Sequence, residues 1–102
     1  MKEKISVIIK EPNKNPRNVY ISNTLENLQK IVGGYIEVVT LCSDFVIVCN
    51  EEGNLKGLPY CCNICNVDFV GTIILCGADG EYFADIPLEF QIIKKLFPRL
   101  WE

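Results

Sequence analysis

Hydrophobic and other residues alternate at the start of the chain. Ile5, Val7 and Ile9 recur at every second position, which is the period of a β-strand with one buried face. The stretch from Pro12 to Pro16 is rich in turn-forming residues, and extended character resumes at residues 19–21. The chain is therefore predicted to begin with a pair of strands.

A helix is predicted after this pair. Asn23 is followed three residues later by Glu26, the spacing of a capping box in which both side chains bond to free amides at a helix start. Apolar residues within 25–32 fall on one helical face. Gly33 and Gly34 then end the helix, because glycine adopts the left-handed conformation of a C-cap without a steric clash.

The middle of the chain is predicted to form a β-hairpin. Residues 35–42 and 45–50 are rich in β-branched and aromatic side chains, and only Ser43 and Asp44 separate them, which is the length of a tight turn. We expect these two strands to lie at the centre of the sheet.

A long loop and a second hairpin should follow. Residues 51–59 contain two glycines and a proline, so the chain is expected to leave the sheet and to remain irregular to about Val67. Residues 69–76 are predicted to form a buried strand, 78–80 a turn and 81–84 a short returning strand.

A last helix completes the predicted fold. Pro87 suits the first turn of a helix, the following residues give it a broad apolar face, and Pro98 stops it. There is no internal repeat or linker, so residues 1–102 are expected to form a single α+β domain. Its core is a mostly antiparallel mixed sheet of about five to six strands, with two helices packed on it.

Composition restricts the function classes. The chain has 102 residues, 49% hydrophobic and 23% charged, which is typical of a globular domain. A net charge of -3, with ten basic residues scattered between Lys2 and Arg99, disfavours nucleic acid as a partner. No export signal or membrane-spanning run is visible, so a cytoplasmic location is expected.

Six cysteines are a high count for a chain without a visible export signal. Three of them lie in apolar strand-like runs, where a thiol behaves as a small hydrophobic group. Cys61, Cys62 and Cys65 form a cluster whose spacing also suits a zinc knuckle or a redox pair. Zinc would need a fourth thiolate from the three strand cysteines, which are Cys42, Cys49 and Cys76, since the chain has no histidine. No cofactor is otherwise expected, and a structural zinc module is kept as an alternative.

Several short motifs resemble the family called domain of unknown function 3846. They are Val32-Gly33-Gly34-Tyr35-Ile36-Glu37, Asn50-Glu51-Glu52-Gly53 with Leu55, Gly57-Leu58-Pro59 and Gly71-Thr72. The resemblance covers nearly the whole chain and implies an accessory protein of phages or other mobile elements, without an established activity. Where the family usually has a polar Asn-Arg pair after Gly-Leu-Pro, this chain has Cys61 and Cys62, so thiol chemistry there would be particular to this protein.

Catalytic equipment is sparse. The absence of histidine removes the usual base of a serine or cysteine nucleophile, and no phosphate-binding glycine loop is present. An enzyme is therefore the less favoured class. A small enzyme would have to use two carboxylates across a cleft, drawn from Glu37, Asp44, Glu51, Glu52, Asp68 and Asp79.

The leading hypothesis is a non-enzymatic phage or mobile-element protein that binds a host protein or a small ligand and antagonises host defence. A protein blocker should show an exposed apolar or acidic patch, whereas a nucleotide sponge should show a pocket with aromatic and basic groups. The candidate binding residues are Tyr35, Asn50, Glu51, Glu52, Gly53, Gly57, Leu58, Pro59, Lys10 and Arg17.

The same motifs also have purely structural explanations. Gly33 can serve as a helix C-cap, and Gly53 can supply a positive φ angle to a turn. The apolar tail at Leu100 and Trp101 needs cover, which we expect from the protein's own core. The alternative is a second subunit in a homo-oligomer.

Overall fold

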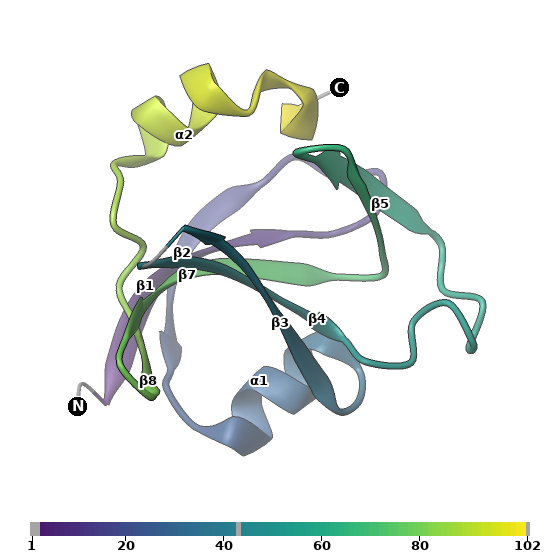
Figure 1. Ribbon diagram of the computed structural model, residues 1–102, viewed down its shortest axis with the longest axis horizontal. Coiled ribbons are helices and arrows are strands. Elements are labelled where there is room, and N and C mark those ends of the chain that lie inside the picture. Colours follow the sequence, from purple (N-terminus) through teal and green to yellow (C-terminus); the bar gives the residue numbers. More distant parts are fainter. Residues whose placement is uncertain (1–2, 43, 102) are drawn as a thin grey trace.

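Antiparallel strands build most of the structure, a computed structural model that describes residues 3–42 and 44–101. The main sheet has six strands in the order β2-β1-β7-β4-β3, with β8 paired to β7, and β5 and β6 form a separate two-stranded sheet (Figure 1). The strands are β1 (Lys4–Lys10), β2 (Arg17–Ser22), β3 (Ile36–Cys42), β4 (Phe45–Asn50), β5 (Tyr60–Ile64), β6 (Val67–Val70), β7 (Ile73–Asp79) and β8 (Tyr82–Ala84). The helices are α1 (Leu25–Val32), α2 (Phe90–Leu96) and the 3-10 helix η1 (Pro98–Trp101).

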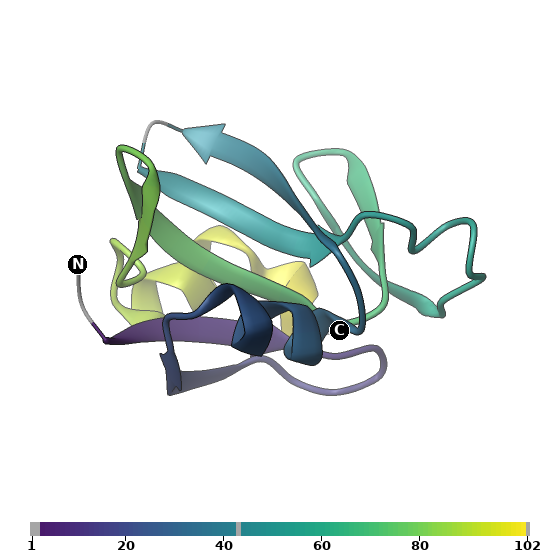
Figure 2. The same ribbon diagram turned by 90° about the horizontal axis from the view of Figure 1, so that it is seen from below.

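The main sheet is covered on both faces. Helix α1 lies on one face, and α2 with η1 lies on the other, as Figures 1 and 2 show. Alternate residues of β4 therefore enter two different cores: Phe45 and Ile47 pack on the α2 side, and Val46 and Val48 pack on the α1 side. This burial of both faces explains the continuous apolar run of β4 and confirms the predicted α+β class.

Helix α1 begins one residue later than the capping-box prediction. Thr24 is the N-cap, and its Oγ1 accepts a hydrogen bond from Asn27 N at 3.2 Å. The predicted cap, Asn23, instead donates from Nδ2 to the carbonyl of Phe83 at 3.1 Å. The predicted C-cap is confirmed, because Gly33 has a φ of 84° and donates its N–H to a carbonyl of the last turn.

Strand β3 is an edge strand, so the prediction that both hairpin strands lie at the centre is wrong for β3. Strand β7 occupies the middle of the sheet, between β1 and β4. Pattern alone did not separate the cases, because an edge strand with both faces partly covered carries the same β-branched residues as an inner strand. The expected hairpin turn includes Ser43, which lies outside the described residues.

The irregular segment ends earlier than expected. It stops at Tyr60, where β5 begins a hairpin with β6 through Cys65 and Asn66, which have left-handed φ angles of 51° and 66°. The predicted strand 69–76 is divided at Gly71, whose φ is 72°. Strand β7 then runs through Asp79, so the predicted turn at 78–80 is displaced toward Glu81.

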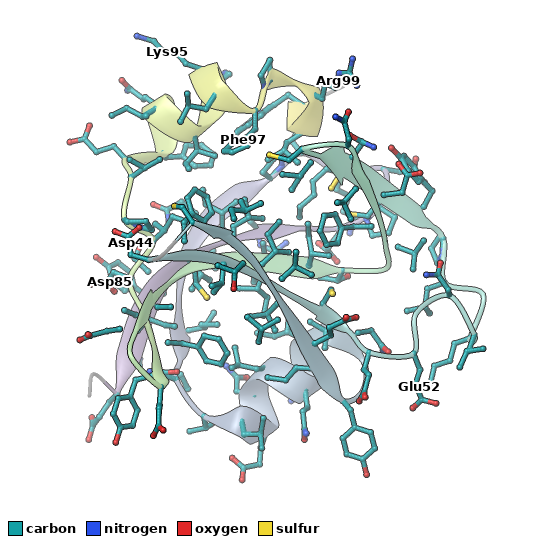
Figure 3. The ribbon with its side chains drawn as sticks, in the orientation of Figure 1. Asp44, Glu52, Asp85, Lys95, Phe97 and Arg99 are labelled. Carbon is teal, nitrogen blue, oxygen red and sulfur yellow. The ribbon has the colours of Figure 1, made fainter. Side chains whose placement is uncertain are left out.

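Helix α2 starts at Phe90, and Pro87 lies in a bend before it rather than in its first turn. The tail folds back as expected: Leu100 is 1% exposed in the α2-side core, and the rings of Trp101 and Phe90 meet edge to face at 5.5 Å. Figure 3 shows Phe97 pointing from this tail toward the sheet, where it meets Phe45 at 6.0 Å. Within the described part of the chain, no helix has the length and apolar character to span a membrane.

Candidate functional site

The motifs singled out in the sequence meet around Asn50, the last residue of β4. Asn50 is 6% exposed, its Nδ2 donates to the carbonyl of Val32 at 3.1 Å, and its Oδ1 accepts from Glu52 N at 2.8 Å. One side chain thus connects the end of α1 to the turn after β4. We call the segments it joins, residues 32–35, 50–59 and 71, the signature joint.

Two positions of the signature joint require glycine, because neighbouring side chains leave no room for a Cβ atom. A Cβ atom on Gly34 would lie 2.9 Å from Nδ2 of Asn50, and one on Gly53 would lie 2.8 Å from Cγ2 of Val70. The expectation that Gly53 supplies a positive φ is wrong, since the positive-φ glycines are at other positions. Close approach of neighbouring side chains, rather than turn geometry, explains this glycine.

Leu58 anchors the loop that follows β4 by a backbone hydrogen bond and by side-chain packing. Its N–H donates to the carbonyl of Gly53 at 3.0 Å, and its side chain occupies the space where Gly71, with a φ of 72°, has no Cβ. Gly71 also donates its N–H to the carbonyl of Pro59 at 2.8 Å. Gly57, exposed with a φ of 66°, completes the turns of this loop. The Gly-Leu-Pro segment is therefore a structural anchor.

Other candidate binding residues of the joint remain available to a partner. Tyr35 is 67% exposed, and its carbonyl accepts a hydrogen bond from Glu51 N at 2.8 Å. Glu51 and Glu52 are also exposed, and Figure 3 shows Glu52 pointing away from the loop.

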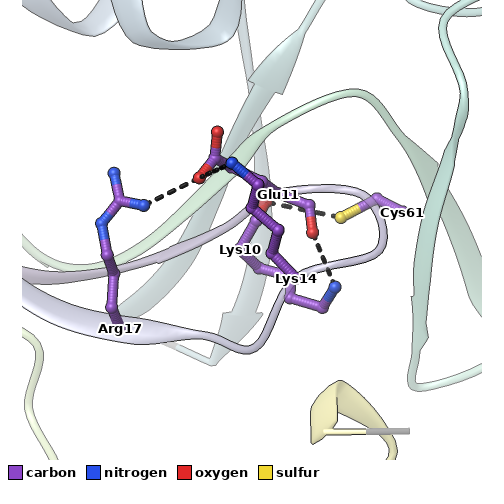
Figure 4. Close-up of polar contacts among 5 residues, drawn as sticks. All are labelled: Lys10, Glu11, Lys14, Arg17 and Cys61. Atoms are coloured by element: carbon purple, nitrogen blue, oxygen red, sulfur yellow. Dashed lines mark hydrogen bonds and ion pairs between the residues drawn. The ribbon is translucent and has the colours of Figure 1, made fainter.

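Lys10 and Arg17 lie elsewhere, around Glu11 in the connection between β1 and β2 (Figure 4). Lys10 is 3% exposed and its Nζ donates to the Glu11 carbonyl at 2.7 Å. Arg17 bonds to Oε2 of Glu11 at 2.8 Å, and this hydrogen bond lowers the pKa of the Glu11 carboxyl. Because β2 and β3 are opposite edges of the main sheet, the fold does not bring these two cations to Tyr35.

A groove of about 210 Å³ opens beside the joint, between the β3–β4 pair and β6. Glu37 of β3, Glu51 after β4 and Asp68 of β6 supply carboxylates from three separate segments. The remaining lining is apolar or amide, and no Lys or Arg belongs to it. We call it the acidic groove, and it is lined by Glu37, Val39, Cys49, Asn50, Glu51, Gly53, Asn54, Val67, Asp68, Phe69 and Val70.

The carboxylates of the groove are solvated. Glu37, Glu51 and Asp68 are exposed, and Asp68 accepts a hydrogen bond from Asn63 Nδ2 at 2.8 Å. The other three carboxylates considered for acid–base chemistry, Asp44, Glu52 and Asp79, are exposed as well and lie outside the groove lining. All six carboxylates therefore face solvent, and none of them is enclosed in a buried cleft. The arrangement suits attraction of a cation better than proton transfer.

Only three of the eleven residues that line this groove, Asn50, Glu51 and Gly53, were among the predicted binding residues. Val39, Cys49 and Asp68 were not linked to the Asn50–Gly53 turn, because the chain was expected to remain irregular to about Val67 and no hairpin was predicted before Phe69. The missing signal was the hairpin β5–β6, which brings β6 beside β4.

Burial, with a smaller contribution from the Glu37 charge, raises the pKa of the Cys49 thiol to about 11.

The cysteine cluster is divided between core and surface. Cys61 and Cys62 are both buried although they are adjacent, because the pairing of β5 with β6 shifts register between Tyr60 and Cys62. Cys61 donates to the Lys10 carbonyl at 3.4 Å (Figure 4), and Cys65 is exposed at the hairpin turn. The interaction between the adjacent Cys61 and Cys62 thiols lowers the pKa of Cys61 and raises that of Cys62. Across residues 3–42 and 44–101, no three side chains of Cys, Asp or Glu gather as metal ligands.

Thiol labelling of the native protein should separate two cysteines from the rest. Cys42 and Cys65 are exposed and should react with iodoacetamide within minutes at pH 8, whereas the four buried thiols should react only after unfolding. Peptide mass spectrometry of native and denatured samples measures this directly. Labelling of Cys61 or Cys62 as fast as Cys65 would contradict the packing of β5.

The buried thiols also set an alkaline limit. Burial raises the pKa of Cys76 to about 12 and the pKa of Cys49 to about 11, and both lie above the ordinary thiol value of 9.0. Their contribution to stability is complete below pH 9 and is lost as the pH rises through these values. The urea concentration at the midpoint of denaturation should therefore decrease as the pH is raised from 9 to 11.

Fold and site define a small α+β protein with an anchored loop and an acidic groove, and with none of the usual nucleophile–histidine pairs. The chain belongs to the family described as Domain of unknown function (DUF3846), whose family model matches residues 3–98. The comparisons with curated proteins and with solved structures found no match.

Proposed function

We propose that the protein is a non-enzymatic binding module that holds a positively charged segment of a partner protein in the acidic groove. The observation that carries the proposal is the convergence of Glu37, Glu51 and Asp68 from three segments on one apolar-floored groove without a lining cation. Solvated carboxylates above an apolar floor suit the amphipathic side chain of Lys or Arg, whose stem packs while its charge pairs.

The nucleotide-sponge form of the hypothesis has less support. The groove beside the joint is acidic and would repel a phosphate. A second hollow, of about 320 Å³ between the β5–β6 turn and η1, contains Arg99 and Phe97. The ring of Phe97, however, already packs against Phe45 and points toward the sheet, so it is not free to stack on a base.

The proposed class of partner rests on the phage or mobile-element context that the family resemblance implies. A protein carried by a phage or mobile element acts inside a host cell, so the proposed partner is a host protein with an exposed basic segment. Blocking that segment is a direct way to antagonise a host defence component, since occupancy of a surface needs no catalysis.

The test compares two charge-neutralised variants. Glu37→Gln with Glu51→Gln removes two groove charges, and Glu26→Gln with Glu89→Gln removes two charges from the exposed starts of the helices. A partner captured by the wild-type protein from host lysate is identified by mass spectrometry, and its affinity is measured by calorimetry. The groove variant should bind at least about tenfold more weakly, and the control within about twofold.

Equal affinity of the groove variant and the wild-type protein would overturn the proposal. A nucleotide that raises the melting temperature of both variants equally would support the sponge form in its place.

A further inference from the structure

Strand β3 leaves one edge of the main sheet open. Among the described residues, β3 ends the strand order of the main sheet and pairs only with β4. The strand contains Ile36, three further β-branched residues and a single charge, with no Pro, Lys or Arg. Natural edge strands usually carry a proline or charged side chains, lysine above all, which prevent pairing with another chain. The opposite edge, β2, begins with Arg17 and Asn18.

The backbone groups of this edge can be assigned from the hairpin register. The carbonyl of Tyr35 accepts from Glu51 N, so this is a hydrogen-bonded pair, and bonded and non-bonded pairs alternate along antiparallel strands. The odd-numbered residues of β3 therefore bond to β4. The even-numbered residues Ile36, Val38 and Thr40 direct their N–H and C=O groups away from the sheet.

We propose that β3 pairs with β3 of a second copy of this chain, joining two main sheets across a two-fold axis at Val38. A register shift between Thr40 and Cys42 ends the regular part of the strand, and Val38 is the midpoint of the regular residues 36–40. A two-fold pairing about this midpoint gives the longest ladder that the strand allows.

The side chains match in this register. Val38 lies opposite its own copy and Ile36 opposite Thr40, which are β-branched pairs of the kind that stabilise neighbouring strands. Glu37 lies opposite Val39, so no like charges face each other. A shift by one ladder step toward the N-terminus would place Glu37 opposite Glu37, and the repulsion disfavours that alternative.

A hollow beside the edge gives the pairing additional apolar surface. It has a volume of about 310 Å³ and lies on the α1 side of the sheet. Val38 is 43% exposed at its rim. Because a two-fold axis perpendicular to the sheet keeps the same face on the same side, the two hollows would adjoin. The lining residues are Val38, Thr40, Val46, Ala78, Gly80, Glu81, Tyr82 and Phe83.

The pairing should be weak. One strand per copy contributes less than the roughly 800 Å² per partner of a standard interface, so the dimer is expected to have a micromolar dissociation constant. Two residues of the paired strand, Glu37 and Val39, also line the acidic groove, so the second copy would lie beside the rim of that groove.

Sedimentation of the full chain over a concentration series tests the proposal. Wild-type protein should show a monomer–dimer equilibrium at about 1 to 100 μM. Val38→Lys places two ammonium groups opposite each other and should raise the dissociation constant of the dimer at least about thirtyfold. Val38→Thr keeps a β-branched residue, and Tyr20→Lys changes the exposed edge strand β2, so both should leave the equilibrium within about threefold.

Hydrogen exchange at single-residue resolution tests the register. The amides of Ile36, Val38 and Thr40 should become protected as the protein concentration rises, while those of Glu37 and Val39, bonded to β4 in either state, should not change. A protein that remains monomeric at about 100 μM overturns the proposal. A dimer that survives Val38→Lys in a variant with unchanged melting temperature overturns it as well.

Discussion

Ending the chain at Phe97 is expected to lower the free energy of unfolding by about 4 kcal/mol. Leu100 is 1% exposed in the core beneath α2 and β5, and Trp101 covers Phe90 edge to face. Loss of both side chains exposes the apolar surface of that core and leaves α2 without its neighbour. Urea denaturation monitored by far-UV circular dichroism measures the change.

Two single substitutions show where that effect originates. Leu100→Ala should cost about 3 kcal/mol, because the vacated space is enclosed by other buried residues. Arg99→Ala changes an exposed neighbour in the same 3-10 helix and should stay within about 0.5 kcal/mol. A shortened chain with the wild-type denaturation midpoint would contradict the observed packing of the tail.

Asn50→Ala is expected to cost about 3 kcal/mol. The substitution removes both side-chain hydrogen bonds of the signature joint and leaves the carbonyl of Val32 and the N–H of Glu52 without that partner. Each group then bears part of its desolvation cost, and the loop after β4 loses its connection to α1. The measurement is again the free energy of unfolding in urea.

The matched control for Asn50 is Asn54→Ala, an exposed asparagine in the same loop, which should change stability by less than about 0.5 kcal/mol. Asn50→Asp keeps the acceptor for Glu52 N but loses the donor to Val32, so its cost should be at least that of one hydrogen bond. Equal stability of Asn50→Ala and Asn54→Ala would show that the buried amide does not hold the joint.

Local patterns predicted the elements of the fold better than their arrangement. The period-two run of β1, the glycine that ends α1 and the hairpin β3–β4 each depend on neighbours in sequence, and all three are present. The central place of β7 and the edge position of β3 depend on pairings between distant segments. Hydrophobic period reports how much of a strand is buried but not which strand lies beside it.

The candidate site shows the same division. The Asn50–Gly53 turn and the Gly-Leu-Pro segment were recognised as motifs, yet their shared purpose depends on where the amide of Asn50 points. The acidic groove could not be predicted from sequence, because Glu37 and Asp68 are far apart in the chain. They line the same groove only because β6 carries Asp68 to the side of the β3–β4 pair. The pairing of Lys10 and Arg17 with Glu11 was likewise invisible to composition.

The separate hairpin β5–β6 has a consequence for how members of this family can diverge. As far as the described residues show, its two strands pair only with each other and not with the six-stranded sheet. Insertions or deletions at its turn therefore alter no register in the main sheet, while they reshape the hollow of about 320 Å³ that Cys65 and Asn66 line. The length of this segment can therefore vary among family members at little cost to folding.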